Sequence, residues 1–373
     1  MKESVMKRYY FVRRCFLLLG VIFLVVLLSW LKFLYQPVIT DPKGYRYIVK
    51  SGTAIRSVID DWYATDIISH RVYFNFLIHL RGDGEALKAG EYFFPKGSTP
   101  SSMLNQMVTG RGMIYHIFTI IPGWRFSELK AALLQENFLY HALPKLSDEA
   151  LMSRLGHKGL TPEGEFYPDT YYFAEGSSDL ELLRRANKAM QSKLKIAWNK
   201  RYPNLPFKNA YQALIAASLI EKEAYLPSER PIIAGVLVNR LQRDMLLQFD
   251  PTVIYGLNTL YNGKLNKSDL LIETAYNTYL HKGLPPSPIA MPSMGSIMAA
   301  VNPDINTFFY FVARGDGSHQ FSETLAEHNA AVIVIKKFNS NGFLNYTSPF
   351  EKGGLRGVLY KSLPTSLFQR EGS

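Results

Sequence analysis

The most prominent feature in the pattern of hydrophobic and polar residues is an uncharged run near the N-terminus, CFLLLGVIFLVVLLSWL at residues 15–31. The apolar character continues to residue 35, and about twenty residues at 1.5 Å per residue span a hydrocarbon core of about 30 Å. Lys7, Arg8, Arg13 and Arg14 precede the run, so the positive-inside rule predicts a cytoplasmic N-terminus. We therefore expect a basic cytoplasmic segment at 1–14 and a transmembrane signal anchor at 15–35.

A cleaved signal peptide is the alternative explanation of this run. No small-x-small cleavage site follows it; Trp30, Phe33 and Tyr35 stand there instead, as is typical of residues at a membrane interface. Cys15 lies before the apolar core and after two arginines, so it is not placed as a lipoprotein acceptor. The pattern favours a single-pass protein of the cell inner (cytoplasmic) membrane with its folded part in the periplasm.

The next periodic segments predict a small strand–helix–helix–strand subdomain at 45–110. Residues 45–50 are rich in Tyr, Ile and Val, which favour strands. Apolar residues then recur at the i, i+3, i+4, i+7 spacing of a helix, at Ile55, Val58, Ile59 and Trp62. The remaining elements expected here are a helix at 71–80, a strand at 88–94 and a short helix at 101–108.

The rest of the chain predicts a larger mixed α/β domain at 111–337. Helical periodicity is clearer than strand alternation, and the elements do not alternate as they would around a parallel sheet, so the fold class is α+β. Residues from about 338 are rich in Gly, Ser, Asn and Pro and predict a flexible C-terminal tail at 338–373. Strands are expected at 114–121 and 308–312, and helices at 124–137, 178–200, 214–223 and 322–336.

Composition excludes several classes of protein. The net charge is +11, but five of these charges lie before residue 33, so the remainder carries only a mild basic excess and no nucleic-acid signal. The single cysteine excludes an intramolecular disulfide framework and a cysteine-based zinc site. There is no Gly-rich phosphate loop and no H-E-x-x-H spacing, so we expect neither a cofactor nor a metal.

The candidate catalytic group lies where an apolar helix ends in Glu221-Lys222-Glu223. A 3.6-residue period places Glu223 over Ala216, Leu219 and Ile220, and a carboxyl group beside apolar surface resists ionisation. A general acid that works near neutral pH needs this property, and the charge of Glu221 would add to it. The alternative is a solvated charge cluster at a helix end.

Several sequence words around Glu223 resemble the YceG-like endolytic murein transglycosylases. The words are EG-x-x-x-PDTY at 163–171, IEKEA at 220–224, SER at 228–230, NRL at 239–241, LQ-x-DPTVIYGL at 247–257, AYNTY at 275–279 and GLPP at 283–286. The resemblance extends over roughly residues 45–337, and it implies that Glu223, the second Glu of E-K-E, is catalytic. It also implies that the small subdomain is LysM-like, either as a glycan-binding module or as a packing unit that has lost this ability.

The resemblance implies a specific reaction on peptidoglycan. A lytic transglycosylase cleaves the bond between N-acetylmuramic acid and N-acetylglucosamine and leaves a 1,6-anhydro-N-acetylmuramic acid end. Family behaviour further implies endolytic cleavage of nascent glycan strands at the membrane, which terminates elongation beside peptidoglycan synthases as further partners. Because Tyr rings stack on sugars and polar side chains bond to hydroxyl and N-acetyl groups, we expect substrate binding by Gln248, Asp250, Asn277 and Tyr279.

Two other functions fit the same residues. One is a murein hydrolase that uses Glu223 as acid and Asp250, Asp169 or Glu273 as base. The other is a non-enzymatic, membrane-anchored glycan-binding protein. Structural roles also remain open, since a Pro-rich loop such as 276–289 can brace a core and Asp250 can cap a helix.

Overall fold

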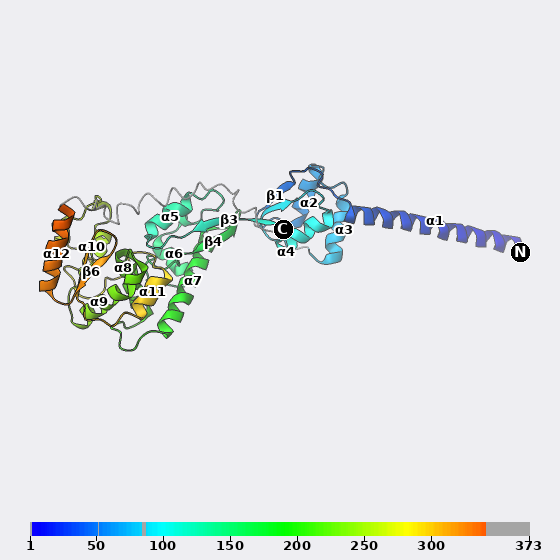
Figure 1. The fold of residues 1–373 in the computed structure, drawn as a ribbon. Coiled ribbons are helices and arrows are strands. Elements are labelled where there is room, and N and C mark those ends of the chain that lie inside the picture. Colours follow the sequence, from blue (N-terminus) through cyan, green and yellow to red (C-terminus); the bar gives the residue numbers. More distant parts are fainter. Residues whose placement is uncertain (1, 51, 84–86, 341–373) are drawn as a thin grey trace, which may run out of the picture. The chain divides into compact units, whose positions relative to one another are not determined.

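The computed structural model describes residues 2–50, 52–83 and 87–340, which form two compact units (Figure 1). The first unit comprises the described residues of Met1–Ile117 with Asn137–Tyr140 and Tyr172–Ser178, and the remaining residues form the second. The last helix continues to Ser340, and residues 341–373 of the predicted tail lie outside the described residues.

The first unit begins with one long helix and continues as strand, helix, helix, strand, helix. Its elements are α1 (Lys2–Tyr35), β1 (Tyr45–Val49), α2 (Ile55–Ala64), α3 (Arg71–Arg81), β2 (Gly90–Phe94), α4 (Pro100–Thr109) and most of β3 (Met113–Thr119). The strands and helices expected between residues 45 and 110 lie within a few residues of β1, α2, α3, β2 and α4. Within α1, Tyr9–Tyr35 is long and apolar enough to cross a membrane.

The end of α1 belongs to the hydrophobic core of the first unit. Phe33 is only 8% exposed and packs with Tyr73 and Phe74, at ring-centroid distances of 5.6 and 6.1 Å. The centre of this core is Trp62, which lies edge-on to Phe74 and to other rings. Aromatic side chains therefore join the apolar helix to the folded part of the same unit.

The second unit is mainly helical. Its elements are α5 (Phe126–Leu134), η1 (Leu143–Lys145), α6 (Asp148–Arg154), α7 (Asp179–Asn199), α8 (Ala210–Glu223), η2 (Pro227–Glu229), α9 (Arg230–Gln242), α10 (Asp250–Leu257), η3 (Asn258–Leu260), η4 (Asp269–Leu271), α11 (Met294–Val301), β5 (Tyr310–Ala313), β6 (His319–Ser322) and α12 (Leu325–Ser340).

Two sheets complete the fold. One has four strands in the order β1-β2-β3-β4, with β4 at Thr170–Ala174, and the other is the antiparallel hairpin β5-β6. In the first sheet β1 pairs antiparallel with β2, and β2 with β3, so its strands follow the chain order. The α+β class is confirmed.

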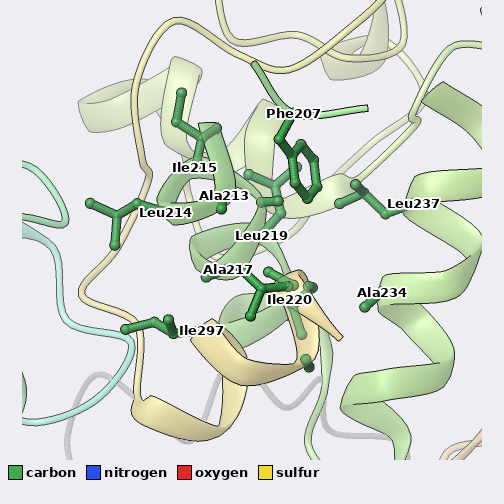
Figure 2. Close-up of a cluster of buried hydrophobic side chains, with 14 of the residues drawn as sticks. Phe207, Ala213, Leu214, Ile215, Ala217, Leu219, Ile220, Ala234, Leu237 and Ile297 are labelled. Atoms are coloured by element: carbon green, nitrogen blue, oxygen red, sulfur yellow. The ribbon is translucent and has the colours of Figure 1, made fainter. Parts of the chain in front are cut away.

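Helix α8 is the centre of the second unit's core. Residues Ala213 to Ile220 are all buried, and the helix packs against α7, α9 and α11 (Figure 2). Alanines at 213, 216 and 217 allow these neighbouring helices to approach closely, while Leu219 and Ile220 fill the space between them. A helix fixed on every side holds the residues at its C-terminal end in a defined position.

The sequence missed some elements and misplaced one boundary. Strand β4 was not predicted, and neither were helices α6 and α11 and strand β6. Helix α10 begins at Asp250 with Phe249 as its N-cap, so the alternative of Asp250 as an N-cap is wrong. The carboxyl of Asp250 is therefore available for another contact.

Candidate active site

The last three residues of α8 project into three different environments. Successive helical residues are rotated by about 100°, so Glu221, Lys222 and Glu223 cannot share neighbours. Lys222 Nζ donates to the carbonyl oxygen of Gly123 at 3.3 Å, and burial lowers the pKa of this lysine. Glu221 and Glu223 differ in their hydrogen-bond partners.

Glu221 is a structural residue at the start of α11. Its Oε2 accepts hydrogen bonds from the Ser293 N–H and hydroxyl at 2.9 and 2.5 Å and from the Ser296 hydroxyl at 2.6 Å. Its Oε1 pairs with Arg230 at 3.3 Å. These contacts use the carboxylate to hold α8 against α11, which separates it from the role of Glu223.

Glu223 carries a carboxyl group whose environment favours the protonated form. Its Oε2 is buried and accepts no hydrogen bond from the residues that the structure describes. Burial, and secondly the charge of Asp250, raise the pKa of Glu223 from 4.5 to about 8. The sequence suggested that the charge of Glu221 raises this pKa. In the structure, the charge that does so is that of Asp250.

Asp250 and Tyr279 lie next to this carboxyl. The Tyr279 hydroxyl donates to Asp250 Oδ1 at 2.5 Å, and the charge of Glu223 also acts on Tyr279. Partial burial of its carboxyl raises the pKa of Asp250, although the residue as a whole is exposed. The hydrogen bond from Tyr279 lowers this pKa and so acts in the opposite direction. Two predicted site residues are thus brought together beside Glu223.

Gln248 is exposed and is held in an unusual backbone conformation. Its φ is 53°, and its N–H donates to the carbonyl of Thr278 at 3.0 Å. Its Oε1 accepts from Arg240 at 3.3 Å. The buried Arg240 also donates to the carbonyls of Leu247 and Phe309, both at 2.6 Å, so it braces the segment that leads to Asp250.

Asn277 is buried, and its side chain bonds to its own loop. The residue is 0% exposed, and its Nδ2 donates to the carbonyls of Leu270 and Ile272 at 3.0 and 2.8 Å. Its Oδ1 accepts from the N–H of Tyr279 at 2.9 Å. All of these contacts lie between residues 270 and 279 and occupy the amide, which favours a role in positioning Tyr279; that Asn277 binds substrate stays a prediction.

The other candidate acids are not placed like Asp250. Asp169 is exposed and its Oδ1 accepts from the N–H of Thr170, while Glu273 is exposed and pairs with His281 at 2.5 Å. Neither is a cause of the raised Glu223 pKa. Of the three carboxylates considered as the base of a hydrolase, Asp250 is the one whose charge acts on Glu223.

Glu163 and Glu165, at the start of the EG-x-x-x-PDTY word, bond to other elements of the second unit. Glu163 accepts from the N–H of Phe126 at 3.0 Å, at the start of α5, and from the Tyr255 hydroxyl at 3.1 Å. Glu165 accepts from Gln191 at 2.7 Å. Burial raises the pKa of each to about 7, and both join elements of the second unit.

Tyr225, two residues after Glu223, was not predicted as a site residue. This side chain is 66% exposed, and a Cβ at Gly317 would meet its ring at 2.6 Å. Gly317 also has a φ of +95°, so the turn between β5 and β6 favours glycine for two reasons. The available signal in the sequence was an aromatic residue two positions after the candidate acid.

One group of side chains in the first unit has metal-ligand geometry. Glu91, His116 and Glu175 each offer a ligand atom, and these atoms lie within 4.8 Å of one another. Glu91 already pairs with Arg46 at 3.1 Å, and the His116 ring stacks on Phe138 at 3.8 Å. These contacts already occupy Glu91 and His116 within the first unit.

The chain is similar to proteins of known name over most of its length. It is 31% identical over 320 residues to the endolytic murein transglycosylase of Bacillus subtilis (strain 168), which covers 80% of this chain and 87% of that protein. It is 26% identical over 374 residues to the protein of the same name from Streptococcus pneumoniae (strain R6), covering 87% of this chain and 66% of that one. A crystal structure of a yceG-like protein from Listeria monocytogenes matches with a TM-score of 0.50 and 26% identity, over 78% of this chain and 99% of the other.

The family match and the geometry concern the same residues. The sequence model of the YceG-like family matches residues 47–333. Within this range, the sequence words named above contain Glu223 itself. They also contain Arg230, which pairs with Glu221, and Arg240, which bonds to the segment before Asp250. The AYNTY word contains Tyr279, which bonds to Asp250. The chain therefore belongs to the YceG-like family.

Proposed function

We propose that the protein is an endolytic peptidoglycan lytic transglycosylase, a carbon–oxygen lyase, with Glu223 as its single acid and base. The observation that carries the proposal is the carboxyl of Glu223, buried at Oε2 and with a pKa raised to about 8. Such a group is protonated at neutral pH and can donate a proton to a leaving oxygen.

The proposed reaction balances with one carboxyl group. Glu223 gives its proton to the glycosidic oxygen as the bond from C1 of N-acetylmuramic acid to that oxygen breaks. The C6 hydroxyl of the same sugar then bonds to C1, and its proton passes to the Glu223 carboxylate. The product is a 1,6-anhydro end, no water is consumed, and the carboxyl is protonated again. Since the nucleophile belongs to the sugar, its proximity replaces a second protein carboxylate.

Substrate contacts are proposed for the exposed groups around this carboxyl. Gln248, Asp250 and Tyr279 present polar atoms there, and the ring of Tyr225 offers a surface on which a sugar can stack. Asn277 supports this set by holding Tyr279 in place. We further propose, from the likeness of the first unit's outline to a LysM module, that this unit contributes to glycan binding.

We propose that α1 is retained as a signal anchor with a cytoplasmic N-terminus. Phe33 is buried in the core of the first unit, and the Tyr73 hydroxyl donates to Ser29 at 3.0 Å. A folded unit that uses the last residues of the helix as core supports an anchor over a cleaved signal. The anchor would keep the enzyme where new strands emerge beside peptidoglycan synthases, as termination of strand elongation requires.

Product analysis tests the reaction. Full-length protein and Glu223→Gln are incubated with uncrosslinked glycan strands, and the fragments are analysed by mass spectrometry. We expect internal fragments with 1,6-anhydro-N-acetylmuramic acid ends from the wild type and none from Glu223→Gln. Glu273→Gln is the matched control, because it makes the same exchange at an exposed glutamate and should cleave normally. Anhydro products from Glu223→Gln would refute the proposed role of Glu223.

The second candidate is a murein hydrolase, and the position of Asp250 is the observation in its favour. A carboxylate whose charge acts on the acid is a candidate base for activating water. Fragments with reducing ends that disappear in Asp250→Asn would establish the hydrolase. Anhydro ends exclude it, because hydrolysis adds water at C1.

A further inference from the structure

An apolar stripe runs along the outer side of α3. Val72, Phe76 and Leu80 are 75%, 53% and 66% exposed. Their spacing of four residues places them on one face of the helix, over a length of about 12 Å. Large apolar residues at three successive turns of one helix form a surface that solvent does not favour.

The stripe is not required by the core of the first unit. The inner face of α3 buries Phe74, Leu77 and Ile78 against that core. The outer residues could therefore be polar without loss of core packing, so their apolar character indicates a second environment.

The stripe lies beside the apolar helix α1, near the C-terminal end of that helix. The Phe76 ring lies 5.0 Å from the Trp30 ring, and Tyr73 contacts Trp30 at 5.8 Å between centroids. With the hydrogen bond from the Tyr73 hydroxyl to Ser29, these contacts place α3 beside residues 29–30, before α1 ends at Tyr35 (Figure 1). A Trp near the end of a membrane-spanning helix marks the level of the lipid headgroups.

The charges on α3 suit a lipid surface. The helix contains no acidic residue, and its two arginines, Arg71 and Arg81, are its first and last residues. Arg71 pairs with Asp60 at 3.2 Å and Arg81 with Asp83 at 2.6 Å. Between them the helix exposes Val72, Phe76 and Leu80 together with the polar residues Asn75 and His79, and helices that lie in a membrane interface combine apolar and polar faces in this way.

We propose that α3 lies on the outer surface of the membrane with Val72, Phe76 and Leu80 inserted among the lipid headgroups and upper acyl chains. The inference rests on the proposed retention of α1 as an anchor and extends it, since the first unit would then contact the bilayer at a second point. Lipid is the favoured occupant because the stripe is continuous with the Trp30 end of a helix that is itself long and apolar enough to span the bilayer.

Spin-label accessibility of the full-length chain in single-copy lipid nanodiscs tests this contact. Labels are attached at 72, 76 and 80, one at a time, in a Cys15→Ser background. We expect high collision rates with oxygen, which concentrates in lipid, and low rates with a water-soluble nickel chelate. Tyr115 is the control, since it is an equally exposed apolar residue on β3 and should show the opposite preference.

The remaining outcomes overturn either the α3 contact or the anchor. Nickel accessibility at 72, 76 and 80 equal to that at 115 would overturn the α3 proposal. Low accessibility to both reagents would overturn it in favour of coverage by protein. A label at Leu24 in α1 reports on the anchor alone, so its exposure to the nickel chelate would refute the anchor as well. None of these readings depends on Glu223 or on glycan cleavage.

Discussion

At the residue scale, Glu221 and Glu223 carry the same side chain two positions apart and have different roles because of their partners. Glu221 accepts hydrogen bonds from Ser293, Ser296 and Arg230. Glu223 has a buried oxygen that accepts none from the described residues, and Asp250 adds an unfavourable charge. The first arrangement stabilises an anion, and the second stabilises a bound proton.

This contrast predicts how stability depends on pH. The folded state raises the pKa of Glu223 from 4.5 to about 8, so the wild type loses stability relative to Glu223→Gln as pH rises between these values. One pKa unit corresponds to about 1.4 kcal/mol, so the stability gain of Glu223→Gln should approach about 3–5 kcal/mol above pH 8 and vanish below pH 4. Urea unfolding across this range measures it.

The control for this experiment is Glu273→Gln, whose exposed carboxyl should give the wild-type dependence on pH. A constant difference between Glu223→Gln and wild type at every pH would contradict the raised pKa.

A second prediction concerns the pH dependence of activity. Since the charge of Asp250 helps to raise the Glu223 pKa, Asp250→Asn should move the fall of kcat/KM from about pH 8 to lower pH. Rates of anhydro-end formation measured from acidic to alkaline pH give the position of this fall. An unmoved fall in Asp250→Asn would show that Asp250 does not act on the catalytic proton.

The sequence indicated Glu223 but not its electrostatic partner. Helical periodicity placed apolar residues beneath the carboxyl, and the structure shows Ala216, Leu219 and Ile220 fully buried. The contact between Asp250 and Tyr279 joins residues 29 positions apart across a loop, which periodicity does not register. The partners of Asn277 at residues 270 and 272 were not predictable for the same reason, because they depend on how the loop turns.

At the element scale, helix α8 positions the site because its end is attached to α11. Glu221→Gln should lower the free energy of unfolding by about 1.5–3 kcal/mol, since hydrogen bonds to a charged acceptor are lost within a buried network. The pH at which activity falls should stay near that of the wild type, because Glu221 does not set the Glu223 pKa.

Chemical denaturation and a pH–rate profile of Glu221→Gln provide the two readouts. Ser296→Ala, which removes one of these hydrogen bonds, should cost less than Glu221→Gln. Equal stability of Glu221→Gln and wild type would refute the attachment between α8 and α11.

Elements with strong periodicity were predictable, and those defined by tertiary contacts were not. The helices of the first unit follow the sequence pattern closely. Strand β4 exists through pairing within its sheet, and α11 is only eight residues long, so neither has a distinctive local signal. Short elements of this kind are fixed by the core that they cover.

At the scale of the whole molecule, the apolar helix and the first unit share one core. Phe33→Ala should lower the stability of the first unit by about 3–5 kcal/mol, the usual cost of removing a buried phenyl ring. Phe23→Ala is the matched control, because Phe23 is exposed on the same helix and does not contribute to this core. Thermal unfolding of the full chain in nanodiscs compares them, and equal effects of the two exchanges would contradict the shared core.

The burial of Phe33 also has a consequence for biosynthesis. With α1 as the proposed anchor, the residue that completes the core of the first unit lies at the end of the segment that would leave the export channel sideways into the bilayer. The polypeptide that follows would reach the far side of the membrane before that segment is released, and its core would stay incomplete until then. Final folding of the unit would then be timed by membrane insertion, and a chain stalled in the channel would remain open to proteases that act on unfolded protein.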